Sequence, residues 1–329
     1  MPTYDKIYLA NRAKELSVVR DTFEKVLRLC DILRFFDSSE YFRQKLALKG
    51  GTAINLLFFD LPRLSVDIDL DFCENVSREE MIRIRETIDE RLKKYMAAAG
   101  YTLSPKSKMY HSLYSYVYEY INSGGVKDNI KIEINYSLRS HILPTQHMIL
   151  PSHIVTGDFE VNTLSPIEIY ATKTVALLTR GAARDLYDMD YMIRREYLSE
   201  DTLDLYRRCV VFYLAVATET PMMTVDYTAV EQITPHRIMT DLKPVIRDRD
   251  AFELDDAKRR VEAFLDKNLY LTENDLYFLR SFRLGRYKPE NLFSDERVLK
   301  RIADHPMALW KTQRNREKNR NYFFKVVGF

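Results

Sequence analysis

The sequence predicts an α/β (α+β) chain, in which a mixed sheet with flanking helices is followed by an all-α C-terminal domain. Between residues 47 and 162, short strand-like segments alternate with helical ones. From residue 163 onward, apolar residues recur at three- and four-residue steps, as on one face of a helix. A chain of 329 residues is long enough for about two domains. We therefore expect a first domain over 1–162 and a second over 163–329.

The first domain is predicted element by element. Residues 1 to about 46 show helical periodicity, "LALKG" looks like a short buried strand, and "GTAINLLFF" looks like a helix. "SVDIDLDF" alternates as a strand does. A capping box of Ser77 and Glu80 opens a long helix, and Gly100 ends it. The segments 101–121 and 129–137 are rich in tyrosine and β-branched residues and are predicted as strands that form core and sheet face.

The second domain is predicted to be helical throughout. "SPIEIYATKTVALLTR" opens with Ser165 as N-cap, Pro166 at the first helical position and Glu168 three residues after the cap, the pattern of a capping box. Helical patterns continue through "DLYDMDYMIRREYL", "DTLDLYRRCVVFYLAVAT", "DDAKRRVEAFLDKNL" and "TENDLYFLRSFRLG".

Composition excludes several classes of protein. A net charge of +2 means that any nucleic-acid-binding patch must be local. Cys30, Cys73 and Cys209 are few, far apart and without CxxC spacing, which argues against a disulfide framework or a zinc knuckle and for a reducing compartment. The N-terminus lacks the apolar core of a signal peptide, and no apolar run approaches the ~18 residues of a membrane span. The expected location is the cytoplasm.

The acidic strand is the first candidate site. Because side chains alternate along a strand, Ser65, Asp67, Asp69 and Asp71 are expected on one face, about 6.6 Å apart for residues two positions apart. Carboxylates at that spacing can converge on divalent cations, and the alternative is a solvent-exposed edge strand with an acidic outer face. We expect Asp71 at the rim of such a site.

The turn Gly50-Gly51-Thr52 is the second candidate, because it precedes a helix whose N-terminus offers free N–H groups to phosphate. The alternative is a plain tight turn. The pairing with nearby metal-binding carboxylates favours a nucleotide site, since Mg²⁺ and triphosphate are needed together. The turn does not match the P-loop pattern GxxxxGK[ST], which argues against an ordinary NTPase.

These two motifs together resemble the core of the nucleotidyltransferase superfamily with the DNA polymerase beta-like fold. More narrowly, they resemble the AbiEii/AbiGii toxin family of type IV toxin–antitoxin and phage-abortive-infection systems. That family combines a G-[GS]-[TS] turn with a downstream R-x-S-x-D-[IL]-D strand, which Arg63, Ser65, Asp67 and Asp69 match. The similarity extends over roughly residues 40–311. It implies a nucleotidyltransferase-type sheet.

Further candidates lie downstream. Glu133 in "NIKIEINYS" is the candidate third carboxylate, and a polar residue on an open strand face is the alternative. Lys173 lies among small and apolar residues, so its charge either reaches solvent or grips a triphosphate. The family carries a lysine followed by R-D-x-x-D, which Lys173, Arg184, Asp185 and Asp188 match. The resemblance implies that Lys173 contacts nucleotide and that either Asp185 or Asp188 completes the active site; an intrahelical Arg184–Asp188 pair is the alternative.

The implied reaction is transfer of a nucleotidyl group from an NTP to an acceptor hydroxyl. Asp67 and Asp69, with Glu133 as candidate third ligand, would hold two Mg²⁺ ions. The nucleotide's phosphates would be bound by Gly50, Gly51, Thr52 and Ser65, and Lys173 would add positive charge. Arg63 is a further candidate nucleotide-binding residue.

The acceptor is expected to be tRNA, because family members have been linked to it. The basic C-terminal segment is a candidate RNA clamp with aromatic residues, or else a charged surface helix; its members are Lys311, Arg314, Arg316, Lys318, Arg320, Lys325, Trp310, Tyr322, Phe323 and Phe324. A cognate antitoxin would be encoded nearby and need not touch the toxin. Two other functions stay open: a kinase-like phosphotransferase toxin acting on protein, and a non-enzymatic RNA-binding protein.

Overall fold

The computed structural model describes residues 4–59, 61–151, 158–218, 224–247 and 251–327, the last seven of these for their backbone only. The chain forms two compact units. The first comprises residues 1–139, 145–164 and 240–251, and the second comprises 140–144, 165–239 and 252–329. Of the helices in the described ranges, none is long and apolar enough to cross a bilayer. Cys30, Cys73 and Cys209 are all free.

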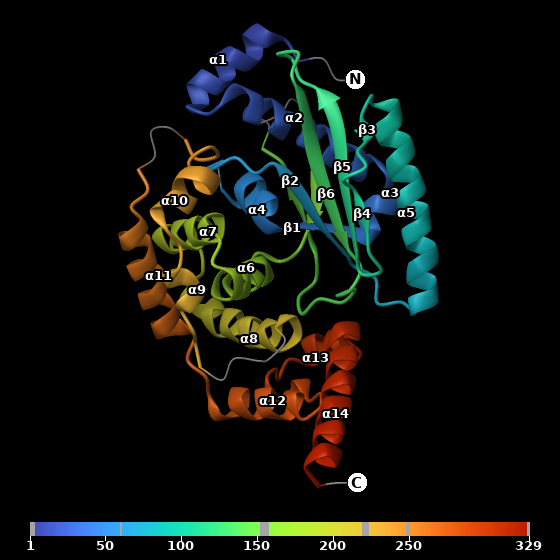
Figure 1. Cartoon of the computed structure of the whole chain (residues 1–329), viewed down its shortest axis with the longest axis vertical. Coiled ribbons are helices and arrows are strands. Elements are labelled where there is room, and N and C mark those ends of the chain that lie inside the picture. Colours follow the sequence, from blue (N-terminus) through green and yellow to red (C-terminus); the bar gives the residue numbers. More distant parts are fainter. Residues whose placement is uncertain (1–3, 60, 152–157, 219–223, 248–250, 328–329) are drawn as a thin grey trace. The chain divides into compact units, whose positions relative to one another are not determined.

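The first unit is a mixed eight-stranded sheet with flanking helices (Figure 1). Strand order is β3-β5-β6-β2-β1-β8-β7, and β4 pairs with β5 outside this path. The helical elements are α1 (Lys6–Leu16), α2 (Arg20–Ser38), α3 (Glu40–Lys45), α4 (Gly50–Ala53), the π-helical turn η1 (Ile54–Phe58) and α5 (Arg78–Ala98). The strands are β1 (Leu46–Lys49), β2 (Asp67–Phe72), β3 (Thr102–Leu103), β4 (Lys108–Met109), β5 (Leu113–Ile121), β6 (Lys127–Asn135), β7 (Gln146–Ile149) and β8 (Glu160–Thr163).

Two parallel and several antiparallel pairings make the sheet mixed, as the sequence predicts. β2 runs parallel to β6, and β1 parallel to β8, whereas β1 and β2 are antiparallel. The strands β7 and β8 were not predicted, because their segment has no clear alternation. Three of the four tyrosines of β5 are confirmed as core: Tyr116, Tyr118 and Tyr120 are buried on the face that α2 and α5 cover.

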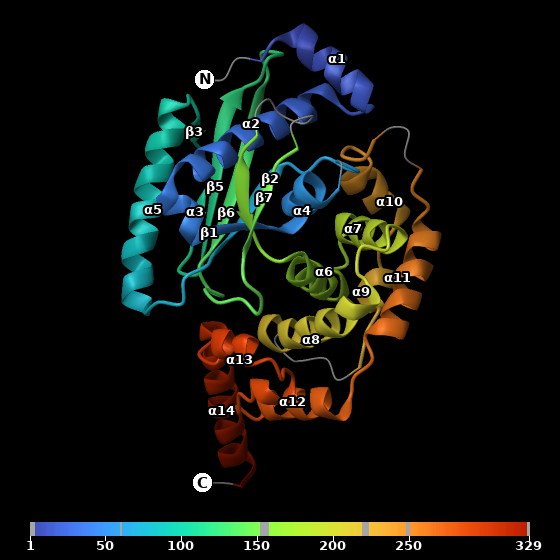
Figure 2. The same cartoon turned by 180° about the vertical axis from the view of Figure 1, so that it is seen from behind.

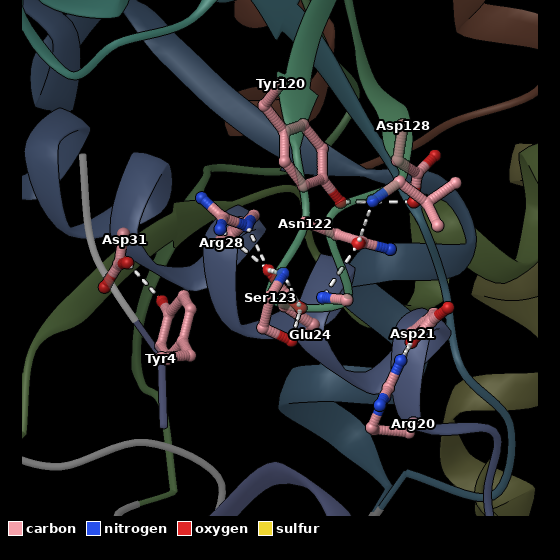
Figure 3. Close-up of polar contacts among 12 residues, drawn as sticks. Tyr4, Arg20, Asp21, Glu24, Arg28, Asp31, Tyr120, Asn122, Ser123 and Asp128 are labelled. Atoms are coloured by element: carbon pink, nitrogen blue, oxygen red, sulfur yellow. Dashed lines mark hydrogen bonds and ion pairs between the residues drawn. The ribbon is translucent and has the colours of Figure 1, made fainter. Parts of the chain in front are cut away.

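A buried ion pair of α2, Glu24 with Arg28, is hydrogen-bonded to the turn between β5 and β6 (Figure 3). The Glu24 carboxylate accepts hydrogen bonds from Arg28 Nη2 at 2.7 Å and from the Ser123 backbone N–H at 2.9 Å. The guanidinium of Arg28 also lies 4.3 Å from the ring centre of Tyr120. Helical periodicity places both charged residues one turn apart, but only the fold shows that the pair is buried.

The second unit is helical in its described residues (Figure 2). Its elements are α6 (Pro166–Arg180), α7 (Ala183–Arg194), α8 (Glu200–Ala217), α9 (Thr228–Glu231), α10 (Pro235–Arg237), α11 (Leu254–Asn268), α12 (Glu273–Arg283), the 3₁₀ turn η3 (Pro289–Asn291), α13 (Glu296–Ile302) and α14 (Pro306–Val327). A π-helical turn, η2 (Ile238–Leu242), runs into the segment 240–251, which belongs to the first unit. That segment joins the sheet unit by a Leu64 N–H bond to the Val245 carbonyl at 2.6 Å.

The predicted capping box at the start of α6 is wrong in its chemistry. Ser165 is the N-cap, but its side chain makes no capping hydrogen bond. Glu168 is fully buried and instead accepts the backbone N–H of Ile142 at 2.8 Å and of Leu143 at 3.0 Å, and the Tyr213 hydroxyl. The backbone N–H groups of Ile142 and Leu143 need acceptors because they are buried or partly buried. The Glu168 carboxylate accepts them and therefore does not cap the helix. At α5, in contrast, Ser77 does accept the Glu80 N–H at 3.1 Å.

Candidate functional site

The glycine turn lies directly against the acidic strand. Gly50 has φ +69°, and a Cβ added there would come within 2.7 Å of Asp69 Oδ2. Both the left-handed backbone and the close approach require glycine at this position. The turn therefore brings the start of α4 beside the Asp69 carboxylate. The first N–H groups of a helix have no partner within that helix.

Hydrogen bonds fix the shape of this turn. Thr52 Oγ1 donates to Ser65 Oγ at 2.9 Å and also contacts the Asp67 carbonyl. Ser65 precedes β2 and lies close to Gly51, where an added Cβ would be 3.2 Å from Ser65 Oγ. Arg63 is buried and donates from Nη1 to the Leu64 carbonyl at 3.1 Å. The residues predicted to bind nucleotide in the first unit are thus brought together.

Asn55 belongs to the same network, although the sequence reasoning missed it. It is fully buried, donates from Nδ2 to the Gly51 carbonyl at 2.7 Å, and accepts the Arg63 N–H at 3.3 Å. A single amide within the apolar run "INLLFF" is the signal that could have identified it, because a buried amide needs hydrogen-bond partners.

Strand register places the predicted carboxylates side by side. In the parallel pairing of β2 with β6, Asp69 lies opposite Glu133 and Asp67 lies opposite Lys131. Residues paired in this way project from the same face of a sheet, with strands roughly 4.8 Å apart. Asp67, Asp69 and Glu133 therefore share one face, and Lys49 joins them there as the antiparallel partner of Asp69.

Two lysines counterbalance this acidic face, and the sequence reasoning missed both. Lys49 Nζ lies 2.5 Å from Asp71 Oδ1, and Lys131 Nζ lies 2.9 Å from Glu133 Oε1. Burial alone would lower the pKa of Lys49, but the charges of Asp71 and Asp69 outweigh it and raise the pKa. The pKa of Lys131 is also raised, because Glu133, Asp67 and Asp69 together outweigh burial. In the protein alone, the carboxylates tolerate one another because these ammonium groups lie among them.

Asp71 departs from the expectation that it lies at the rim. Its side chain is only 1% exposed, and Oδ1 accepts from Asn135 Nδ2 at 3.0 Å as well as from Lys49. Ala47 and Asn135 are its partners on the neighbouring strands, so β2 carries Asp71 deeper into the sheet than Asp67 and Asp69. It is a buried member of an ion pair.

The donor set suits a hard cation. Carboxylate oxygens are the protein ligands that Mg²⁺ prefers, and the three candidate donors occupy adjacent positions of one face. Within the described ranges, however, no three or more His, Cys, Asp or Glu side chains are gathered into a metal-binding group. Glu133 is engaged with Lys131 instead. A cation held by all three carboxylates would therefore have to draw Glu133 away from its lysine.

The second unit holds the other predicted residues in a buried cluster. Lys173 on α6 is 7% exposed, and its Nζ lies 2.8 Å from Asp185 Oδ1 and 3.0 Å from Asp188 Oδ2, both on α7. Lys173 does not reach into solvent: it is paired with the two candidate aspartates, which shows that its charge needs a partner. The other carboxylate oxygen of Asp185, Oδ2, forms an ion pair with Arg180 Nη2 at 2.8 Å. Asp188 pairs with Lys173 in the structure. The sequence offered an intrahelical pair with Arg184 as the alternative for this aspartate.

Comparisons with known proteins bear on this arrangement. A protein-family model described as "Nucleotidyl transferase AbiEii toxin, Type IV TA system" matches residues 34–284. Among solved structures, the chain is similar to MenT4, a nucleotidyltransferase toxin from Mycobacterium tuberculosis H37Rv. The TM-score is 0.61 with 17% sequence identity, over 93% of this chain and 99% of that one. At that identity, the similarity shows a shared fold. A comparison with curated proteins found no match.

Proposed function

The chain belongs to the AbiEii nucleotidyltransferase toxin family and is a nucleotidyltransferase; we propose that it transfers a nucleotidyl group from an NTP to an RNA acceptor, tRNA in particular, in a Mg²⁺-dependent reaction. One observation carries this proposal. The glycine turn at the start of α4 lies against Asp69, and Asp69 lies in register with Glu133 and beside Asp67 on one sheet face. A phosphate-binding turn next to paired carboxylates is what a nucleotide–metal complex requires.

Each group then has a role that follows from its chemistry. Asp67, Asp69 and Glu133 would hold two Mg²⁺ ions, which when bound supply activation of the acceptor oxygen and neutralisation of the leaving pyrophosphate. The backbone N–H groups of Gly51 and Thr52 bind phosphate oxygens, and Ser65 holds Thr52 in place.

The second unit supplies a cation. We infer nucleotide contact for Lys173 from the family pattern that it matches, and Asp185 and Asp188 hold its ammonium. Asp185 uses its two oxygens for Lys173 and Arg180, and Asp188 also pairs with Lys173, so either aspartate of the R-D-x-x-D element can position this ammonium. In the reaction, the acceptor hydroxyl loses its proton to water, its oxygen bonds to the α-phosphorus, the bond from the α-phosphorus to the bridging oxygen of the β-phosphate breaks, and pyrophosphate leaves.

The family description includes a type IV toxin–antitoxin system. We extend it to this chain: an antitoxin is encoded nearby, it acts without having to bind the toxin, and the toxin works in the cytoplasm.

The test uses purified protein with Mg²⁺, total tRNA and each of the four α-³²P-labelled NTPs in turn. An Asp67→Ala/Asp69→Ala variant is compared with Glu119→Gln, which changes a carboxylate of the same sheet that is paired with Lys127. We expect label in RNA from wild type and Glu119→Gln, with release of pyrophosphate, and none from the double variant.

Other products would contradict the proposal. Formation of NDP with γ-phosphate on protein would identify a kinase-like phosphotransferase. RNA binding that is equal in wild type and double variant, without any transfer, would identify a non-enzymatic RNA-binding protein.

A further inference from the structure

Exposed arginines of the second unit lie at the end of α12 and on α14. They come from the last turn of α12, from the residues just after it, and from α14. We call them the α12–α14 arginine cluster: Arg280, Arg283, Arg286, Arg314 and Arg316.

The packing of α14 on α12 brings the end of α12 against α14. Gly285 has φ +81°, and a Cβ there would lie 2.7 Å from Arg316 Cβ, so the two backbones meet closely at this point. Arg316 Nη2 donates to the Gly285 carbonyl at 2.9 Å, and Asn319 Nδ2 donates to the Arg283 carbonyl at 3.0 Å. The carbonyls at the end of α12 are thus satisfied by α14, while the arginine side chains of the same turn stay in solvent.

The cluster differs from other exposed arginines of the same unit in having no carboxylate partner. Arg259 pairs with Asp256, and Arg297 pairs with Asp295. In the part of the chain that the structure describes, no member of the cluster forms an ion pair. Glu317, on the exposed side of α14, is engaged by Gln313 at 3.3 Å.

Helix electrostatics explains only part of this. Arg280 and Arg283 lie in the last turn of α12, where cations favour the helix dipole. Arg286 and Arg314 lie outside the last turn of α12, so the dipole of that helix does not account for them. Exposed positive charges without counter-charges favour binding of a polyanion.

An exposed aromatic residue lies on the same helix. Trp310 is the single tryptophan of the chain, it is 49% exposed, and Arg314 Cζ lies 5.4 Å from its ring centre. A flat exposed ring beside a guanidinium can stack on a nucleobase, while neighbouring arginine forks bind phosphates.

We propose that the α12–α14 arginine cluster and Trp310 form the docking surface for a single-stranded part of the RNA acceptor. The arginines bind successive phosphates, and Trp310 stacks on a base with Arg314 beside it. The inference rests on the proposed function for the identity of the polyanion as RNA. Tyr322, Phe323, Phe324 and Lys325, which the sequence also assigns to this segment, have side chains outside the described residues.

The test measures RNA binding without catalysis. A short fluorescein-labelled RNA with a single-stranded end is titrated in EDTA, and binding is followed by anisotropy at several salt concentrations. Arg283→Gln/Arg314→Gln is compared with Arg259→Gln/Arg297→Gln, which removes the same charge from exposed arginines that have carboxylate partners. Because all four side chains are on the surface, unchanged melting temperatures verify folding.

We expect the cluster variant to bind at least tenfold more weakly than the control variant. The slope of the logarithm of the binding constant against the logarithm of the salt concentration should become less steep by about one to two in the cluster variant. Each phosphate contact to a single strand contributes about 0.7 to that slope. Unlabelled RNA should quench the fluorescence of Trp310, and Trp310→Ala should weaken binding roughly tenfold.

Other outcomes overturn the inference. Equal loss of RNA binding in both arginine variants would show that only net charge matters. Unquenched tryptophan fluorescence at saturating RNA would rule out stacking, and cluster-dependent binding to phosphatidylserine vesicles but not to RNA would identify a membrane surface. Since no NTP is present, a failure here leaves the transfer reaction standing if labelled RNA still forms. Conversely, cluster-dependent RNA binding without any transfer would support this surface and contradict the proposed function.

Discussion

Lys49→Met tests whether an ammonium group holds the acidic face together. The substitution keeps the length of the side chain and removes the charge that lies 2.5 Å from Asp71. Asp71 would stay buried, with the Asn135 amide at 3.0 Å as a remaining partner. Removing one member of a buried ion pair costs about 3–5 kcal/mol, because the other charge is left uncompensated. Lys49 is itself 26% exposed and Asn135 remains, so we expect the lower end, about 3 kcal/mol.

The assay is thermal unfolding in EDTA, followed by circular dichroism. A loss of about 3 kcal/mol should lower the melting temperature of the sheet unit by roughly 6–12 °C, at about 2–4 °C per kcal/mol for a unit of this size. Lys131→Met is the matched control, because it removes a lysine from the same sheet face whose side chain is 38% exposed. A pair that exposed is worth about 0–1 kcal/mol.

A second charge removal completes the experiment. Lys49→Met/Asp71→Asn should recover much of the lost stability, since the Asp71 position then no longer holds a buried charge without its lysine. Equal melting temperatures for Lys49→Met and Lys131→Met would refute the reasoning, and so would a double variant that is less stable than Lys49→Met alone.

Three further predictions follow from single contacts. Gly50→Ala should reduce nucleotidyl transfer strongly and destabilise the protein by about 1–3 kcal/mol, because the added Cβ would collide with Asp69 and alanine is strained at a left-handed φ. Gly125→Ala is the control: its φ is +81° and an added Cβ would have nothing within 4 Å, so it should show only the smaller backbone strain and full activity. Burial and then Asp31 raise the pKa of Tyr95 from 10.0 to about 12, so its contribution to stability is complete below pH 10 and lost between pH 10 and 12; melting temperatures should fall over that range, less steeply in Tyr95→Phe. Glu168→Ala should cost about 1–3 kcal/mol in urea unfolding by leaving the N–H groups of Ile142 and Leu143 without their acceptor, and an unchanged midpoint would contradict this account.

The candidate site was found from sequence to the extent that its signals are local. Alternation along β2 places Asp67 and Asp69 on one face, since side chains of a strand alternate regardless of the rest of the fold. The glycine pair at 50–51 marks a turn because of what its backbone alone can adopt. The acid on β6 could be nominated from its own alternation, but only strand pairing shows that Glu133 lies opposite Asp69.

The sequence by itself determined the mixed sheet with helices, the helical second half, the family, and the short motifs of the site. The tertiary structure alone decided which charges pair: Lys49 with Asp71, Lys131 with Glu133, and Lys173 with Asp185 and Asp188. It also decided that Glu168 serves a distant loop, and that residues 240–251 join the sheet unit. The physical reason is the range of the forces involved. Periodicity and backbone preference act between residues a few positions apart, whereas ion pairs and strand register depend on segments that only the folded chain brings together.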